Sequence, residues 1–228
     1  MSDGDDRITI VFDVNETLLD VRSLSPAFEE SLGDASLLPV WFGLLLRNSF
    51  IASATRTYRP FDVQAVDALK LVIRQRALDV DEAVADNVVS GMAQLPAHDD
   101  VVAGLDLLTD AGFRLATLTN SPPHLAVAQL EFAGIADRFE RILSVEATGR
   151  FKPSPEPYDH AAAELGRAAA ELTLVAAHDW DITGAMRVGW SGAFVARPGA
   201  VLGDLGESPD IIGRDIADVA SQLIAASG

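Results

Sequence analysis

The stretch ITIVFDVNETLLD, residues 8–20, decides the fold of this chain. Its first five residues form an unbroken β-branched and aromatic run, which is typical of a strand buried on both faces of a parallel sheet. The strand ends in a carboxylate, Asp13, and Asn15 and Thr17 follow at intervals of two. We therefore ask which chemistry places Asp13 there, and why its neighbour is Asn15 rather than a second Asp.

Similar apolar runs recur along the rest of the chain and predict the other strands of one sheet. They are RLATLT (114–119), RILSV (141–145), LTLVAA (172–177) and GAFVAR (192–197). Helix-period segments lie between them, at 101–112, 124–134 and 156–166. Each ends in a glycine, and Gly112 and Gly134 are placed as C-terminal stops. Alternating strands and helices predict an α/β fold with a doubly wound parallel-sheet core.

Residues 20–97 break this alternation, because they contain helical patterns and no convincing buried strand. We interpret them as a helical cap domain inserted after the first strand. The predicted core domain is then made of residues 1–19 and 98–228, and LPAHDD at 95–100 links the cap back to it.

Composition limits the partners of the chain. Acidic residues outnumber basic ones by 34 to 17, and the net charge of -17 repels nucleic acids and anionic membrane surfaces. The chain has no cysteine, and its first residues lack the pattern of a secretory signal. The apolar stretch at 37–46 is about half as long as a membrane-spanning helix. We expect a cytoplasmic enzyme with a small-molecule substrate and without nucleic-acid or membrane partners; a homodimer is possible through the apolar cap stretch.

Polar residues follow four of the predicted strands. Because ligands bind at the carboxyl ends of parallel strands, these residues are expected to meet at one edge of the sheet. They form the groups Asp13–Thr17, Thr119–Ser121, Arg150–Pro153 and His178–Asp181. Together they predict a nucleophilic site in which Asp13 attacks, Lys152 keeps it ionised, and Asp181 acts on a later water.

The order of these motifs resembles the haloacid dehalogenase superfamily over essentially the whole chain. FDVNETLLD, LTNSPP, GRFKPSPEPY and VAAHDWDITGA are most similar to its 2-haloacid dehalogenase branch, often labelled type II. The resemblance implies a hydrolase that cleaves the carbon–halogen bond of short 2-haloalkanoic acids. Asp13 would displace halide to form an aspartyl ester, and water would release a 2-hydroxy acid with inversion at carbon 2.

The resemblance also implies roles for the neighbouring residues. Thr17 would hydrogen-bond an Asp13 oxygen and Lys152 would pair with Asp13, while Tyr158 matches a tyrosine near that lysine. Thr119 and Asn120 would hold the substrate carboxylate or the ester oxygen. Asp181, directly or through His178, would orient or deprotonate the water.

Asn15 answers the question raised by the first motif. Phosphatases of the superfamily usually carry a second Asp there, which protonates the leaving alcohol, whereas an amide supplies no such proton. Their metal-binding Asp falls near Ala176 or Ala177, and a methyl group does not bind Mg²⁺. Asp179 and Asp181 remain as possible metal ligands, so these residues disfavour metal binding without excluding it. The resemblance implies a reaction without metal or cofactor, because halide leaves as an anion without protonation.

The cap departs from the dehalogenase pattern. Dehalogenases usually carry a halide-binding arginine in a Trp-Arg context, but here the matching pair is Trp41-Phe42 and the nearest cation is Arg47. The halide would be held by Arg47, by Asn48 or by aromatic edges such as Trp41, or not at all. Trp41 and Phe42 have a second interpretation as cap core, and Arg47 as a surface cation.

The second departure is His178, which stands where dehalogenases commonly have an asparagine. It would alter how the hydrolytic water is held, or serve only as a structural hydrogen-bonding residue. The paired aspartates at 99–100 are interpreted as a solvated helix start.

Two alternative functions remain at this point. One is a Mg²⁺-dependent phosphatase of the same superfamily, which Asn15 and Ala176 oppose. The other is a non-catalytic member that binds a small carboxylate, which Phe42 supports and which Asp13, Lys152 and Asp181 oppose.

Overall fold

The computed structural model describes residues 8–227 and contains a six-stranded sheet in the order β3-β2-β1-β4-β5-β6. All neighbouring strands are parallel. The strands are β1 (Thr9–Phe12), β2 (Arg114–Thr119), β3 (Arg141–Ser144), β4 (Leu172–Ala176), β5 (Ser191–Val195) and β6 (Ile211–Gly213). The predicted α/β fold is confirmed, and β6 is an addition that its three residues were too short to predict from the sequence.

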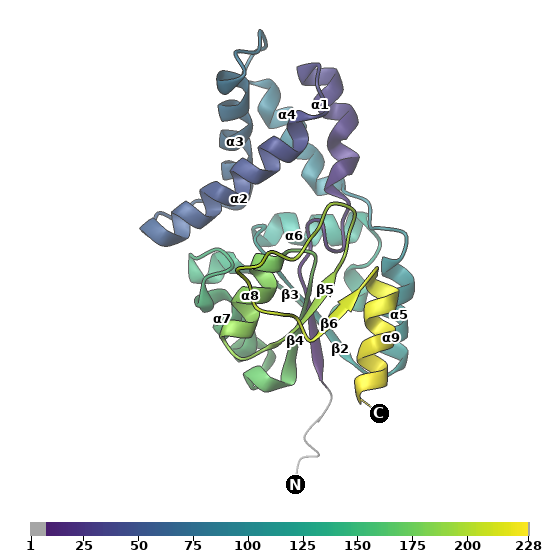
Figure 1. The fold of residues 1–228 in the computed structure, drawn as a ribbon. Helices are drawn as coiled ribbons and strands as arrows, with labels where there is room; N and C mark the ends of the chain where they lie inside the picture. Colours follow the sequence, from purple (N-terminus) through teal and green to yellow (C-terminus); the bar gives the residue numbers. More distant parts are fainter. Residues whose placement is uncertain (1–7, 228) are drawn as a thin grey trace.

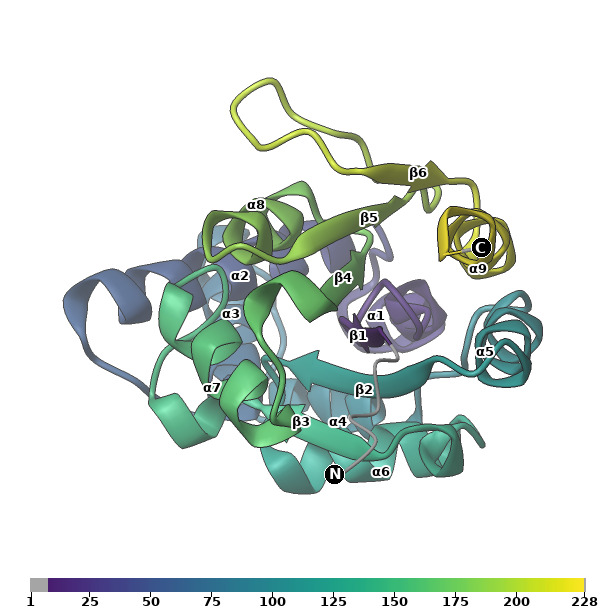
Figure 2. The ribbon, with the colours of Figure 1, turned by 90° about the horizontal axis from the view of Figure 1, so that it is seen from below.

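Helices cover both faces of the sheet, as Figure 2 shows. On one face lie α5 (Val101–Asp110) and α9 (Ile216–Ser227), and on the other lie α7 (Pro155–Leu165) and α8 (Asp179–Arg187). The last core helix, α6 (Pro123–Phe132), packs beside β3. Because β1 lies between β2 and β4, Phe12 pairs with Thr117 and Val175, and the residue after it lies at the centre of the sheet edge.

The inserted cap consists of four helices that stand above the carboxyl edge of the sheet (Figure 1). They are α1 (Ser25–Leu32), α2 (Leu37–Thr55), α3 (Phe61–Gln75) and α4 (Val84–Ser90). The two connections between cap and core run side by side, because Asp20 N–H donates to Pro96 O (2.9 Å) and His98 N–H donates to Leu18 O (3.0 Å). The predicted boundaries between cap and core, at residues 19/20 and 97/98, lie within these paired connections. The division into two domains stays a prediction.

Within residues 8–227 one helix, α2, is long and apolar enough to cross a membrane by length and composition alone. One face of this helix, with Leu38, Trp41 and Leu45, is buried, whereas Ile51 on another face is exposed. Trp41 is fully buried, contacts Phe28 with ring centroids 5.4 Å apart, and donates its indole N–H to Ala65 O at 2.8 Å. Burial in the cap core accounts for the apolar residues on that face of the helix.

Asp100 is a bridging residue rather than the solvated helix start that the sequence suggested. Its carboxylate accepts hydrogen bonds from Arg197 Nη1 at 2.5 Å and from the N–H of Ile216 at 2.7 Å. The guanidinium of Arg197 also donates to Thr17 O through Nε (3.1 Å) and Nη2 (2.8 Å). Asp100 therefore joins the first residue of α9 to the turn after β1.

This bridge gives a pH-dependent contribution to stability. Burial would raise the pKa of Asp100, but the hydrogen bonds from Arg197 and Ile216 outweigh it and hold this pKa below its usual value of 3.8. A lowered folded-state pKa stabilises the fold above the unfolded-state pKa, and this contribution is lost as the pH falls through the folded-state pKa.

We expect Asp100→Asn to lower the free energy of unfolding by about 1.5 kcal/mol at neutral pH, where the charged hydrogen bond is lost. The difference from wild type should shrink as the pH falls below 3.8. Urea unfolding at several pH values measures both effects. The exposed neighbour Asp99 provides the control Asp99→Asn, which should change little. An Asp100→Asn deficit that grows at low pH would contradict this account.

Candidate active site

Asp13 follows β1 at the centre of the sheet edge and is almost fully buried. Thr17 Oγ1 donates to Asp13 Oδ2 at 2.7 Å and accepts from the N–H of Ala177 at 2.9 Å. Because Ala177 lies just beyond β4, this pair of hydrogen bonds ties the turn after β1 to the end of the neighbouring strand. The carboxylate is thereby held in one orientation.

Lys152 is fully buried, and its ammonium group lies between two carboxylates. It donates to Asp13 Oδ1 at 2.9 Å, to Asp181 Oδ2 at 2.5 Å and to the carbonyl of Leu118 at 2.8 Å. An ammonium group has three protons, so all its donors are used. The structure thus brings together the three charged residues that the sequence assigned to the site.

The structure shows which side chains contact Asp181. Within residues 8–227, two side chains hydrogen-bond to its carboxylate. They are Lys152 and Tyr158, whose hydroxyl donates to Asp181 Oδ1 at 2.5 Å. Asp181 is fully buried in the first turn of α8, and its hydrogen bonds direct it away from His178. In this structure Asp181 holds Lys152 in position, and its predicted action on a water stays a prediction.

One ammonium shared by two carboxylates separates their pKa values. Burial would raise the pKa of Asp13, but Lys152 and then His178 outweigh it and hold the pKa below its usual value. Burial raises the pKa of Asp181 by more than Lys152 lowers it, and the nearby charge of Asp13 adds to the rise. Burial would lower the pKa of Lys152, but the two carboxylates raise it. Asp13 is therefore the carboxylate kept ionised, as a nucleophile requires.

His178 lies on the other side of Asp13 and is fixed by aromatic rings. It precedes α8 and is stacked between Trp180, at a centroid distance of 4.9 Å, and Phe42 of the cap, at 6.3 Å. Its Nε2 is 3.9 Å from Asp13 Oδ2 and 3.5 Å from Glu16 Oε2. Phe42 therefore contacts the site through His178.

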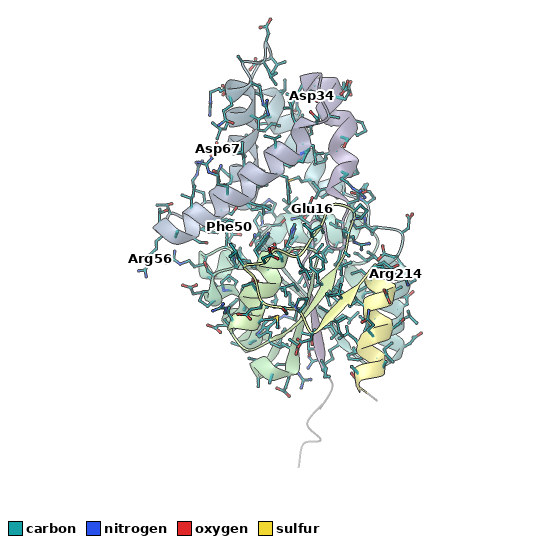
Figure 3. All side chains as sticks on the ribbon, viewed as in Figure 1. Glu16, Asp34, Phe50, Arg56, Asp67 and Arg214 are labelled. Carbon is teal, nitrogen blue, oxygen red and sulfur yellow. The ribbon has the colours of Figure 1, made fainter. Side chains whose placement is uncertain are left out.

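Glu16 is a site residue that the sequence analysis did not single out. It lies where the cap meets the core (Figure 3) and has a backbone φ of 64°, in the left-handed region that favours glycine. Burial raises its pKa, the charge of His178 lowers it, and Asp13 raises it further. The signal that could have found it is its place inside the Asp13–Thr17 motif.

The polar side chains at the end of β2 accept hydrogen bonds from neighbouring backbone N–H groups. Thr119 is fully buried, and its hydroxyl accepts from the N–H of Ser121 at 3.1 Å. Asn120 Oδ1 accepts from the N–H of Lys152 at 3.2 Å. Thr119 thus stabilises a turn and Asn120 positions the loop of Lys152, while their expected contact with the substrate stays a prediction.

Asn15 points away from the nucleophile. Its amide nitrogen donates to Ser121 Oγ at 3.2 Å, and its oxygen accepts from Gln129 Nε2 at 2.9 Å. Asn15 therefore links the turn after β1 to α6, and it is used for structure rather than for proton transfer.

The structure places Arg47 and Trp41 as their second interpretation, a surface cation and a cap-core residue, would have them. Arg47 is exposed on α2, and Trp41 is fully buried in the cap core. Among the residues that line the cavity beside the site, as described for 8–227, neither Arg47 nor Trp41 is found. Arg47 lies five positions beyond Phe42 and thus points to a different side of the helix, since 3.6 residues make one turn.

A cavity of about 630 Å³ lies between the base of the cap and the core. Its wall includes Phe42 and Leu38 of α2, and it also includes Glu16 and His178, the two side chains beside the carboxylate of Asp13. Arg22 and Arg197 line the cavity as well, and each is paired with an aspartate. The cavity therefore reaches the neighbours of Asp13 from the cap side.

The residues of the site do not fit a divalent cation well. Within residues 8–227, no group of three or more His, Asp or Glu side chains is arranged to hold a metal ion. The ammonium of Lys152 lies between Asp13 and Asp181 and already neutralises charge on both carboxylates. At the end of β4, Ala176 and Ala177 offer no oxygen ligand from their side chains.

Gly184 allows the contact between Tyr158 and Asp181. A methyl group at this position would lie 2.5 Å from the Tyr158 hydroxyl and 2.7 Å from Pro153 Cβ. We expect Gly184→Ala to displace Tyr158 and to lower the free energy of unfolding by about 1–3 kcal/mol, because overpacking strains the site. Thermal unfolding measures this loss.

The matched control is Gly43→Ala, because nothing lies within 4 Å of that position and Gly43 is inside a helix. Alanine should stabilise the helix there by about 1 kcal/mol. A Gly184→Ala variant as stable as the wild type would show that Tyr158 has room to move.

The comparisons with known proteins agree with this geometry. A family model described as haloacid dehalogenase-like hydrolase matches residues 9–189. The chain belongs to the haloacid dehalogenase-like hydrolases. This family assignment covers β1 with Asp13, the cap, and the motifs of Lys152 and Asp181.

Relatives within this family are similar over most of their length. The chain is 29% identical to the (S)-2-haloacid dehalogenase of Pseudomonas sp. (strain YL), over 88% of each chain. It is 28% identical to haloacetate dehalogenase H-2 of Moraxella sp. (strain B), over 95% of this chain and 97% of that one. The structure of L-2-haloacid dehalogenase from Xanthobacter autotrophicus with chloropropionic acid covalently bound matches with a TM-score of 0.89 at 25% identity, covering 95% of this chain and 98% of the other.

Proposed function

We propose that the protein hydrolyses short 2-haloalkanoic acids to 2-hydroxy acids through an ester on Asp13. The observation that carries this proposal is the buried Asp13 carboxylate, which Lys152 and Thr17 hold ionised and oriented beneath the cap. Relatives named (S)-2-haloacid dehalogenase and haloacetate dehalogenase, and a structural neighbour with chloropropionic acid covalently bound, support it.

The two oxygens of Asp13 have different surroundings. Oδ2 lies near His178, whose side chain lines the cavity, whereas Oδ1 is bound by Lys152. Oδ2 attacks carbon 2 of the substrate, the carbon–halogen bond breaks, and the halide leaves with the bonding electrons. The configuration at carbon 2 is inverted, and Oδ1 becomes the carbonyl oxygen of the ester.

Hydrolysis then restores the carboxylate. Water attacks Cγ of Asp13, and the ammonium of Lys152 stabilises the negative charge that develops on Oδ1. The bond between Cγ and Oδ2 breaks, so the 2-hydroxy acid leaves with the inverted configuration.

A phosphatase reaction has less support from the same residues. The side chain of Asn15 is directed to Ser121 and Gln129, and an amide does not act as the general acid for a leaving alcohol.

The test is halide release from fluoroacetate, chloroacetate and both enantiomers of 2-chloropropionate in the presence of EDTA, beside a generic phosphatase substrate with Mg²⁺. We expect metal-independent release of halide. Phosphate release that requires Mg²⁺, with no halide from any haloacid, would establish the phosphatase instead. Release of neither halide nor phosphate would favour a non-catalytic protein that binds a small carboxylate.

The expected cytoplasmic location, the possible homodimer and the lack of nucleic-acid or membrane partners stay predictions from composition. Sedimentation of the purified protein would determine the oligomeric state.

A further inference from the structure

We propose that Glu16 and His178 form the general-base pair for ester hydrolysis, in place of Asp181. This inference rests on the proposed function and concerns its second step. It assigns His178 the contact with the water and Glu16, as a positioning residue, the stabilisation of the protonated imidazole.

The distance between His178 and Asp13 suits one intervening water. Nε2 lies 3.9 Å from Asp13 Oδ2, which is too long for a direct hydrogen bond. A water that donates to Nε2 at ordinary hydrogen-bond distance is also close to Cγ of Asp13, the atom it must attack. The other groups bonded to Asp13 are the hydroxyl of Thr17 and the ammonium of Lys152, and neither is a base in this state.

Asp181 is unsuited to this role in the observed geometry. Both of its carboxylate oxygens are bound, one by Lys152 and one by Tyr158, and its side chain has no exposure. To act as a base, Asp181 would have to give up these hydrogen bonds, which would leave the buried ammonium of Lys152 with one carboxylate partner instead of two.

Glu16 is placed by a strained backbone. A non-glycine residue with a φ of 64° has an unfavourable conformation, and such strain is concentrated at functional sites. This conformation brings Glu16 Oε2 to 3.5 Å from His178 Nε2. Esterification removes the charge of Asp13, so Glu16 is then the carboxylate that faces the imidazole.

Charged side chains face His178 from the turn after β1 and from the start of α8. The turn after β1 contributes Asp13 and Glu16, while the cap contributes the uncharged ring of Phe42. On its own helix, Asp179 is bound to the N–H groups of Trp180 and Gly203. Phe42 and Trp180 restrict the ring, so the nitrogen keeps its place next to Asp13.

Protons and bonds balance in this hydrolysis. Water forms a bond to Cγ and transfers a proton to Nε2, and the ionised Glu16 stabilises the imidazolium. The tetrahedral intermediate breaks the bond between Cγ and Oδ2, and the departing oxygen takes the proton from Nε2. The new carboxylic acid of Asp13 releases its remaining proton to solvent and is again a carboxylate.

The experiment separates the two chemical steps in the full-length protein. Wild type, Glu16→Gln and His178→Gln are mixed with excess (S)-2-chloropropionate, and early halide release is followed together with the intact mass of the protein. We expect a burst of about one halide per protein in both variants, followed by ester hydrolysis slowed on the order of a hundredfold. The ester should then accumulate as a mass increase on Asp13.

The pH profile adds a readout that a structural role would not change. The rate of ester hydrolysis should depend on pH in the wild type, as a reaction with a general base does, and His178→Gln should lose this dependence. Glu131→Gln makes the same charge change on the exposed face of α6 and should behave as the wild type. Glu16→Gly removes the carboxylate and also relieves the positive φ, so it tests the role without a penalty to folding.

The outcomes are distinct. Glu16→Gln and Glu16→Gly variants that hydrolyse the ester at the wild-type rate would overturn the role of Glu16 while leaving the proposed function intact. Slow formation of the ester with normal hydrolysis would also overturn it, because Glu16 would then serve the first step. A wild-type protein that releases no halide would instead remove the proposed function, on which this inference depends.

Discussion

The Asp13→Asn variant should release halide at least roughly a thousandfold more slowly than the wild type. An amide has the shape of the carboxylate but is a far weaker nucleophile, so the carbon–halogen bond would not be broken. The new amide would retain an oxygen that accepts a hydrogen bond from Thr17 or Lys152, the two groups that now bind Asp13. Loss of activity should therefore occur without loss of the fold.

Halide release under saturating 2-chloropropionate measures the effect, and circular dichroism with thermal unfolding tests the fold. Asp159→Asn makes the same change at an exposed position of α7 and is the matched control. More than a tenth of the wild-type activity in a folded Asp13→Asn variant would show that Asp13 is not the nucleophile.

The Lys152→Met variant should lose activity and also about 3–5 kcal/mol of stability at neutral pH, because it leaves two buried carboxylates without their cation. Methionine fills a similar volume, so the loss would come from charge rather than from a cavity. Both Asp13 and Asp181 depend on this ammonium, at 2.9 Å and 2.5 Å respectively.

Urea unfolding at pH 7 and near pH 5 tests the electrostatic origin of this loss. Without Lys152, the pKa values of both buried carboxyl groups should rise above their unfolded values. A raised carboxyl pKa destabilises the fold at high pH, and the penalty is relieved as the pH falls and the groups are protonated. The deficit of Lys152→Met should thus shrink at pH 5.

The control is the triple variant Lys152→Met, Asp13→Asn, Asp181→Asn, which removes all three charges. It should recover much of the lost stability, because an uncharged set replaces an unbalanced one. A Lys152→Met protein with a wild-type unfolding curve at pH 7 would mean that the two carboxylates find other partners.

Much of the fold was accessible from local sequence patterns. Five apolar runs correspond to β1 to β5, because strands buried on both faces need continuous apolar side chains. The strand β6 was missed, since it has three residues and its Ile212 is 54% exposed, so the pattern of a buried strand is absent. Asp100 was misinterpreted for a similar reason, because its partner Arg197 lies 97 residues away.

The sequence by itself determined which charged residues meet at the edge of the sheet. Asp13, Lys152 and Asp181 each follow or approach the end of a parallel strand, and parallel strands deliver their carboxyl ends to one edge. The same regularity identified the helical insertion as a cap, and the motif order indicated the family that the match over residues 9–189 shows.

Only the tertiary structure decided what each of these residues contacts. It assigned Asp181 to Lys152 and Tyr158, turned Asn15 toward α6, placed Phe42 against His178, and left Arg47 exposed. The physical reason is that contacts across the cap and the core depend on helix rotation and on a single turn conformation, here that of Glu16. A motif specifies which groups are present at the sheet edge, whereas packing between distant segments specifies their partners.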